Sequence, residues 1–194
     1  MLIIGLTGSI AMGKSFVAQI LKSLDIPVFD ADLEVKTILE QKEVIQKIKE
    51  KFPSVIEENT INKKILTELV FSSHQNMDKL EKIIHPVIRH KIDEFIDIYK
   101  AKNEIIVLDI PLLFETDLHS LCDYVIVTVA SKRIQKIRVK KRNNTTYKNF
   151  RFLLTRQINN NKKAKKADFR IFTNKGKNFT VRQIKNILFI LRGK

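Results

Sequence analysis

The sequence predicts a three-layer α/β/α fold, in which a parallel β-sheet is covered by helices on both faces. Short apolar runs, typical of buried parallel strands, alternate along the chain with longer segments whose apolar residues recur at helical spacing. Parallel strands need crossover connections, and the helices that make those connections also bury the sheet. The chain has 194 residues, a length that predicts one domain.

The predicted strands share a short apolar run that ends at a polar residue or a glycine. The first run leads through Gly5 and Thr7 into a glycine-containing turn, and another ends at Asp109. Such runs suit strands that are buried on both faces of a sheet. The strands are expected over residues 2–6, 26–29, 104–109, 123–130 and 168–172.

Helical spacing of apolar residues predicts three segments in the N-terminal half. They are a helix over 15–24, a more polar helix from 31 to about 50, and a helical stretch over 62–99. Pro86 is expected to break the last of these, because proline removes a backbone donor and biases the preceding His85 away from helical geometry.

The C-terminal half continues the alternation, with one segment that fits it less well. Ser131 is a good N-cap for a helix that runs to Arg142. Residues 143–166 are rich in Asn, Lys and Arg and nearly free of acidic residues, so we interpret them as a solvent-exposed helical flap that moves. The closing helix carries an apolar stripe of Val181, Ile184, Ile187, Leu188 and Leu191.

The charge balance favours an anionic partner. The chain has 36 Lys and Arg against 21 Asp and Glu, a formal net charge of +15. Nucleic acid, anionic lipid and polyphosphate metabolites are all anions that such a cationic surface attracts. The alternative is that the positive charge binds no partner and reflects a lysine-rich composition that favours solubility. The N-terminus lacks a secretory signal pattern, and no apolar run approaches the roughly 18 residues of a membrane span.

The number of cysteines indicates the cellular compartment. Cys122 is the single cysteine, which excludes a disulfide framework and a cysteine-based zinc site. A lone cysteine suits a reducing compartment, so we expect a cytoplasmic protein. With no histidine nearby in the sequence, Cys122 is expected to be a packed thiol rather than a nucleophile.

Residues 8–15 read Gly-Ser-Ile-Ala-Met-Gly-Lys-Ser and match the phosphate-binding loop (P-loop) pattern of P-loop NTPases. Its glycines allow a tight turn, in which successive amide hydrogens form a concave anion site at a helix N-terminus. Lys14 would reach the β- and γ-phosphates, and the Ser15 hydroxyl would bind Mg²⁺. The strand predicted before the loop and the helix predicted after it are the context that this motif requires.

A P-loop predicts a nucleotide, not a reaction. Guanine selection would need Asn-Lys-x-Asp, and the chain carries Lys177 where the aspartate should follow Asn174 and Lys175. The chain is also short for a helicase or a motor. A small kinase fits better, in which the loop holds ATP and a carboxylate near the next strand's end faces the acceptor hydroxyl.

Asp30 and Asp32 follow that next strand, where strand ends in a parallel sheet open into the ligand crevice. A spacing of two points them in different directions, so one can cap the following helix while the other faces the crevice. We predict that Asp32 faces the crevice and acts as a base; the alternative is that both only cap the helix.

Five blocks of the sequence, taken together, resemble the dephospho-CoA kinase family in order and spacing over essentially the whole chain. The blocks are the P-loop, residues 27–32 (Pro-Val-Phe-Asp-Ala-Asp), 84–87 (Ile-His-Pro-Val), 109–115 (Asp-Ile-Pro-Leu-Leu-Phe-Glu), and 167–169 (Ala-Asp-Phe) with Asn174 and Gly176. The resemblance implies transfer of the γ-phosphate of ATP to the ribose 3′-hydroxyl of dephospho-CoA, the last step of coenzyme A synthesis. It also implies a fold similar to that of the nucleoside monophosphate kinases.

The same resemblance implies an organisation for the single domain, residues 1–194. The core would comprise about 1–30, 104–130 and 167–194. A helical acceptor-binding region would span about 31–103, and a lid about 131–166.

The resemblance assigns roles to individual positions. Asp32, Lys14 and Arg138 would be catalytic, and Ser15 would hold Mg²⁺. The dephospho-CoA contacts would be Asp32, His85, Pro111, Leu112 and Leu113. The ATP contacts would be Gly8, Ala11, Met12, Gly13, Lys14, Ser15, Phe16, Arg142, Asn174 and Gly176.

The P-loop departs from the family's usual pattern at four positions. Ser9 and Ala11 stand where glycines are usual, Met12 where a serine is usual, and Phe16 where a threonine is common. Positions 9, 11 and 12 contribute backbone amides, so binding should survive, although Ala11 can adopt only conformations open to a residue with a Cβ. Phe16 is expected to pack toward the sheet.

The basic segment 132–142 leaves alternatives open. Arg138 and Arg142 share one helix face and would neutralise the transferring phosphoryl group as part of a lid; a solvated face and a nucleic-acid surface are the alternatives. Lysines 162, 163, 165 and 166 are expected to be solvated. A kinase of another nucleotide or nucleoside, a nucleic-acid-binding ATPase and a nucleotide-gated binding protein remain alternative functions.

Overall fold

The computed structural model describes residues 1–141 and 147–193, with the side chains of Tyr147 and Lys148 left out. The chain divides into two units. One unit, called the core unit below, comprises residues 1–29 and 98–194, and the other, the inserted unit, comprises residues 30–97. The inserted unit begins one residue before the start of the acceptor-binding region expected from the sequence, about 31–103. It ends six residues before the expected end of that region.

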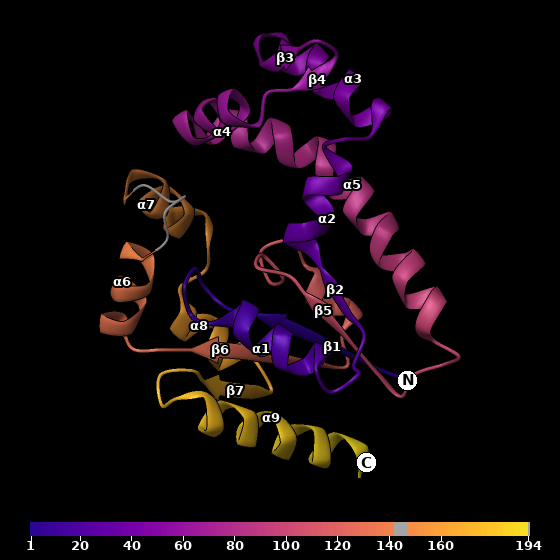
Figure 1. Cartoon of the computed structure of the whole chain (residues 1–194), viewed down its shortest axis with the longest axis vertical. Helices are drawn as coiled ribbons and strands as arrows, with labels where there is room; N and C mark the ends of the chain where they lie inside the picture. Colours follow the sequence, from indigo (N-terminus) through magenta and orange to yellow (C-terminus); the bar gives the residue numbers. More distant parts are fainter. Residues whose placement is uncertain (142–146, 194) are drawn as a thin grey trace. The chain divides into compact units, whose positions relative to one another are not determined.

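The core unit is built on a parallel β-sheet (Figure 1). Within the described residues this sheet has five strands in the order β2-β5-β1-β6-β7. Its strands are β1 (Leu2–Thr7), β2 (Val28–Asp30), β5 (Ile105–Asp109), β6 (Tyr124–Val129) and β7 (Phe169–Phe172). Apart from the start of β2, every strand end lies within one residue of the expected end. The predicted parallel sheet is therefore confirmed.

Strand β1 lies at the centre of this sheet. It pairs in parallel with β5 on one side and with β6 on the other. The register sets Leu6 beside Asp109 and Thr7 beside Val127, so the carboxyl ends of all three strands lie together. The residues directly after β1 therefore begin at the middle of this edge.

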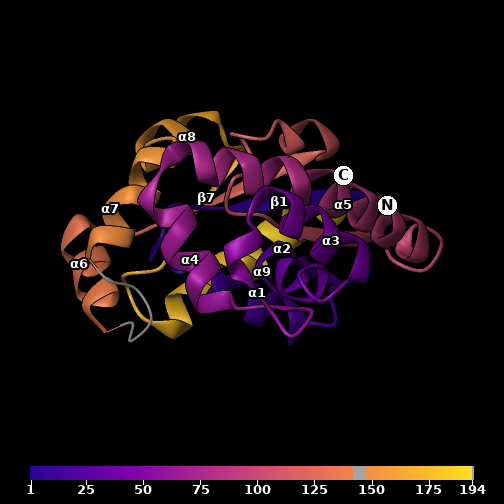
Figure 2. The same ribbon diagram turned by 90° about the horizontal axis from the view of Figure 1, so that it is seen from above.

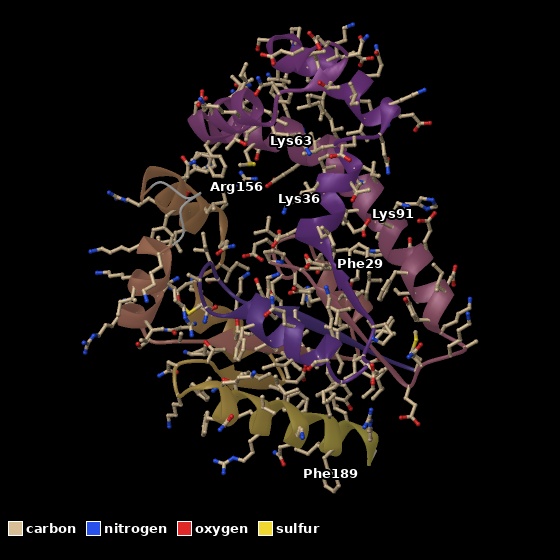
Figure 3. The ribbon with its side chains drawn as sticks, in the orientation of Figure 1. Phe29, Lys36, Lys63, Lys91, Arg156 and Phe189 are labelled. Atoms are coloured by element: carbon tan, nitrogen blue, oxygen red, sulfur yellow. The ribbon has the colours of Figure 1, made fainter. Side chains whose placement is uncertain are left out.

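Helices cover both faces of the sheet (Figure 2). Helices α1 (Lys14–Lys22) and α9 (Lys177–Arg192) contact each other and lie on one face, and α8 (Asn160–Lys166) contacts β6 on the other. The first face buries apolar side chains, each of them less than a tenth exposed. They include Ile4, Leu6, Val17, Leu21, Val107, Ile126, Ile171, Ile184 and Leu188. Phe16 packs against this cluster, as expected.

Among its described residues, the connection between β6 and β7 contains three helices. They are α6 (Lys132–Lys140), α7 (Tyr147–Arg156) and α8 (Figure 1). Ser131 caps α6 by accepting a hydrogen bond from the Ile134 amide at 3.3 Å, as predicted. A 3₁₀ turn, η2 (Leu118–Leu121), lies between β5 and β6.

The inserted unit contains helices and one small hairpin. Its elements are α2 (Ala31–Ile38), α3 (Lys42–Lys51), η1 (Pro53–Val55), β3 (Ile56–Glu57), β4 (Thr60–Ile61) and α4 (Lys63–Ser72), with α5 (His74–Tyr99) continuing two residues into the core unit. Strands β3 and β4 pair antiparallel. Glu58 and Asn59 make the turn between them, both with positive φ, as a tight hairpin turn requires.

Two expectations for this unit are wrong. The polar helix expected to run unbroken from 31 to about 50 is interrupted between α2 and α3. The break within residues 62–99 falls at Ser73, whose backbone is extended, and not at Pro86, which lies inside α5 with His85 also helical. A proline inside a helix costs about 3 kcal/mol. Continuity of α5 offsets this cost because it keeps one buried stripe in line, formed by Ile83, Ile84, Ile88 and Ile92.

Gly5 tests how tightly β1 is packed. A Cβ built on Gly5 would lie 2.6 Å from Leu113 Cδ2 and 2.9 Å from Cys122 Sγ. We expect Gly5→Ala to lower the free energy of unfolding by about 1–3 kcal/mol, because an extra methyl there overpacks the core. Urea unfolding measures this.

Gly193→Ala is the matched control. A Cβ on Gly193 meets nothing closer than 3.5 Å, and its φ is negative, so that variant should unfold like the wild type. Equal stability of the two variants would contradict the close packing of β1.

Candidate active site

The P-loop connects β1 to α1 at the carboxyl edge of the sheet, and two glycines allow its path. A Cβ on Gly8 would collide with the Thr128 hydroxyl on the neighbouring strand β6. Gly13, the N-cap of α1, has a φ of 93° and lies against Thr173. Glycine is favoured at Gly13 because L side chains rarely adopt a positive φ.

Ala11 also lies in the left-handed region, with a φ of 62°. A residue with a Cβ pays roughly 1–2 kcal/mol for this conformation. Ala11 is buried and packs with Val139 of α6 and Phe150 of α7, with Ile10 against them. The Met12 amide donates to the Ser9 carbonyl at 3.1 Å and closes a turn inside the loop.

Lys14 forms an ion pair at the base of the loop. Its Nζ lies 2.7 Å from Oδ1 of Asp109, and both side chains are largely buried, 11% and 2% exposed. Asp109 is the last residue of β5 and lies beside Leu6 in the sheet. Asp109 had no role predicted from the sequence, although its place at the end of a buried strand is the signal that could have indicated this pairing.

Arg138 of α6 lies against the second half of the loop. Its guanidinium donates to the Ala11 carbonyl at 3.3 Å, to Thr173 Oγ1 at 2.9 Å and to the Thr173 carbonyl at 2.7 Å. The Thr173 hydroxyl in turn donates to the Met12 carbonyl at 2.8 Å. Burial lowers the pKa of Arg138 from its ordinary value. Arg142, which the sequence analysis placed with Arg138, lies outside the described residues.

Segment 109–115 forms a second buried ion pair. Lys163 of α8 has no exposed side-chain surface, and its Nζ lies 2.9 Å from Glu115 Oε1. The same ammonium donates to the Pro111 carbonyl at 2.7 Å, and Glu115 accepts from the Ile158 amide at 2.7 Å. Burial lowers the pKa of Lys163, while Glu115 opposes this effect. The expectation that Lys163 is solvated is therefore wrong, because a buried carboxylate and carbonyl supply its partners.

The other predicted acceptor residues of this segment differ in exposure. Pro111 and Leu112 are partly exposed, but Leu113 is fully buried against the position of Gly5 in β1. The Leu113 side chain thus packs in the core. Asn174 and Gly176 are exposed in the turn before α9, and Gly176 is its N-cap with a φ of 90°.

Cys122 is a packed thiol, as predicted. Burial, together with the neighbouring Asp123 carboxylate, raises its pKa to about 12. A thiol with this pKa is almost entirely protonated at neutral pH and is a poor nucleophile.

The remaining predicted residues belong to the inserted unit. Asp30 accepts a hydrogen bond from the Leu33 amide at 3.1 Å and is the N-cap of α2, which confirms that one of the two aspartates caps this helix. Asp32 lies in the first turn of the same helix. His85 is exposed on α5.

The sequence and the site agree with one family of enzymes. The family model of dephospho-CoA kinase matches residues 2–178. The chain belongs to the dephospho-CoA kinase family. A curated dephospho-CoA kinase of Bartonella henselae is 41% identical, over 99% of this chain and 97% of its own length.

Solved structures agree with this assignment to the family. Dephospho-CoA kinase from Campylobacter jejuni is 30% identical and superposes with a TM-score of 0.72, covering 98% of both chains. The crystal structure of TT1252 from Thermus thermophilus is 28% identical with a TM-score of 0.82, covering 97% of this chain and 96% of that one. The expected three-layer fold of P-loop kinases is confirmed.

None of the helices in residues 1–141 and 147–193 is long and apolar enough to cross a membrane. Within the same ranges, no cluster of three or more His, Cys, Asp or Glu side chains could hold a metal ion.

The buried pair of Lys163 and Glu115 predicts a large stability effect. Lys163→Met should lower the free energy of unfolding by about 3 kcal/mol or more, because it leaves a largely buried carboxylate without its cation. Urea unfolding at neutral pH measures this effect.

Lys162→Met is the control, since Lys162 is exposed on the same helix and its loss should cost less than about 0.5 kcal/mol. If both variants unfold at the same urea concentration, the pair does not stabilise the fold.

Proposed function

We propose that this protein transfers the γ-phosphate of ATP to the ribose 3′-hydroxyl of dephospho-CoA and so forms coenzyme A. The observation that carries the proposal is a P-loop with a buried, carboxylate-paired lysine, in a chain that matches the dephospho-CoA kinase family over residues 2–178. The family name supports the acceptor, and the loop supports the donor.

The loop and the first turn of α1 would bind the phosphates of ATP. Backbone amides at a helix N-terminus carry partial positive charge and point toward a bound anion. Lys14 adds a full positive charge, and Asp109 fixes the direction of its side chain. In phosphoryl transfer, positioning and charge neutralisation supply most of the catalysis.

Asp32 is the proposed base for the acceptor hydroxyl. Asp30 is the N-cap of α2, and Asp32, in the first turn of the same helix, is the carboxylate that the family resemblance assigns to this task. The base would accept the hydroxyl proton late in the reaction, as the phosphoryl group moves across. His85, Pro111 and Leu112 would contact the rest of dephospho-CoA, with Leu113 supporting them from the core.

Mg²⁺ fits the residues at the start of α1. This ion usually keeps several waters and binds through phosphate oxygens with few protein ligands. The Ser15 hydroxyl, exposed in the first turn of α1, is a suitable oxygen ligand. When bound, the ion would neutralise negative charge on the β- and γ-phosphates.

Three further assignments belong to this proposal. Arg138 and Arg142 would offset charge on the transferring group, Asn174 and Gly176 would lie near the adenine, and residues 131–166 would act as a lid. The single cysteine fits a reducing compartment, so we place the reaction in the cytoplasm.

The decisive experiment measures ATP consumption with dephospho-CoA as acceptor, with the product identified by mass. Adenosine, AMP, CMP and single-stranded DNA are the comparison acceptors. A coenzyme A product confined to dephospho-CoA is expected. Phosphorylation of another nucleotide, or ATP hydrolysis that rises with DNA and gives no phosphorylated product, would replace the proposal.

Asp32→Asn tests the base. We expect it to keep ATP binding and to lower kcat by roughly 10² or more, the usual size of an acid–base contribution. Steady-state kinetics with saturating ATP and dephospho-CoA measures kcat.

Asp30→Asn is the matched control, because asparagine also caps helices well and should leave kcat within about threefold. Wild-type kcat in Asp32→Asn would remove Asp32 as the base.

A further inference from the structure

The first half of the P-loop is held by side chains from the segment that follows β6. The Ser9 amide donates to Asn160 Oδ1 at 2.8 Å, and the Ile10 amide donates to Gln157 Oε1 at 3.0 Å. Gln135 of α6 donates from Nε2 to the Ile10 carbonyl at 2.9 Å. All of these groups belong to the core unit, and the side chains of Gln135, Gln157 and Asn160 were not singled out from the sequence.

Asn160 is itself fixed on both sides of its carboxamide. Its Nδ2 donates to the Thr128 carbonyl of β6 at 3.1 Å, while its Oδ1 receives the Ser9 amide. The residue is buried, 8% exposed, and begins α8. Lys163, one turn further along α8, anchors that helix through Glu115 and Pro111. The carboxamide that meets the loop is therefore presented by a helix that cannot easily shift.

These contacts divide the loop into two parts. The amides of Ser9 and Ile10 donate to side-chain oxygens, and the Met12 amide donates to the Ser9 carbonyl. Phosphate binding is thus left to Ala11 and to the amides from Gly13 onward. The early part of the loop acts as a support whose shape determines where the later amides point.

The loop needs such support because its sequence is poor in glycine. Ala11 has a left-handed backbone, and strained conformations persist only where the surroundings over-determine them. Apolar packing of Ala11 on Val139 and Phe150 supplies one constraint. The hydrogen bonds to Ser9 and Ile10 supply another, directly before the strained residue.

We infer that Gln157 and Asn160 are positioning residues for ATP, which set the affinity of the P-loop without touching the nucleotide. The inference rests on the proposed function, in that the loop is taken to bind ATP. Losing either carboxamide leaves a loop amide without its acceptor and relaxes the turn before Ala11. The amides that receive the phosphates then lose their common direction.

The test measures direct binding of ATP by calorimetry, with no acceptor present, in Gln157→Met and Asn160→Leu. Both substitutions remove the carboxamide and put an apolar side chain of similar length in its place. Each should raise the Kd and the KM for ATP about tenfold, while kcat at saturating ATP stays within about threefold. Hydrogen exchange of the Ser9 and Ile10 amides should also become faster.

Asn161→Leu is the matched control, since Asn161 is exposed and next to Asn160 on α8. It should bind ATP like the wild type. Thermal unfolding without nucleotide separates a purely structural role: variants with a lowered Tm but a wild-type Kd would overturn the inference. Because Gln157 is only partly buried, we expect Gln157→Met to fold. It therefore tests the inference even if Asn160→Leu does not fold.

The two proposals fail in different ways. A wild-type protein that does not bind ATP overturns the proposed function together with this inference. A wild-type protein that binds ATP, with unchanged binding in Gln157→Met, overturns this inference alone. Tenfold weaker binding in the variants supports the inference even if the acceptor proves to be another molecule.

Discussion

The backbone of residues 8–13 imposes the constraint on which the rest of the core unit depends. A phosphate-binding loop must point several amides at one place, yet this loop has glycine only at Gly8 and Gly13. Its path is therefore held from outside. Strand β1 is paired on both sides, and carbonyls or amides of the loop bind side chains from α6, α8 and the residue after β7.

Segment 109–115 joins this loop to helix α8. It begins at Asp109, which pairs with Lys14, and ends at Glu115, which pairs with Lys163. Between them the Pro111 carbonyl accepts from Lys163 and also from the Thr7 hydroxyl at the end of β1. Burying two ion pairs costs desolvation free energy, so they are weak evidence for stability as such. The first pair instead fixes Lys14 of the P-loop, and the second fixes Lys163 against the Pro111 carbonyl, which Thr7 also contacts directly before the loop.

The fold was largely predictable, because buried parallel strands leave continuous apolar runs that need no tertiary information. The motif and the cap at Asp30 were predictable because each depends on residues close together in sequence. The family was predictable because each of its five blocks is local, although together they span the chain. The helix break predicted at Pro86 was wrong, because the buried stripe of α5 outweighs the local effect of proline. The exposure predicted for Lys163 was also wrong, because nothing in a run of lysines indicates which one pairs with a buried carboxylate.

The partners of the loop could not be found from sequence either. Asn160 and Gln157 lie in a polar segment whose composition is typical of a solvated surface, and their role depends on contacts with residues near the N-terminus. Ser9 and Asn160 are 151 positions apart along the chain, and Ile10 and Gln157 are 147 apart.

That separation has a consequence for how the protein is made. Synthesis runs from the N-terminus, so the motif of residues 8–15 leaves the ribosome long before the carboxamides that shape it, and contacts between distant residues form late. A nascent chain that ends before residue 157 would carry the complete motif without Gln157, Asn160 and Thr173. Nucleotide binding should then arise only near the end of translation, when most of the chain is already available to fold around it.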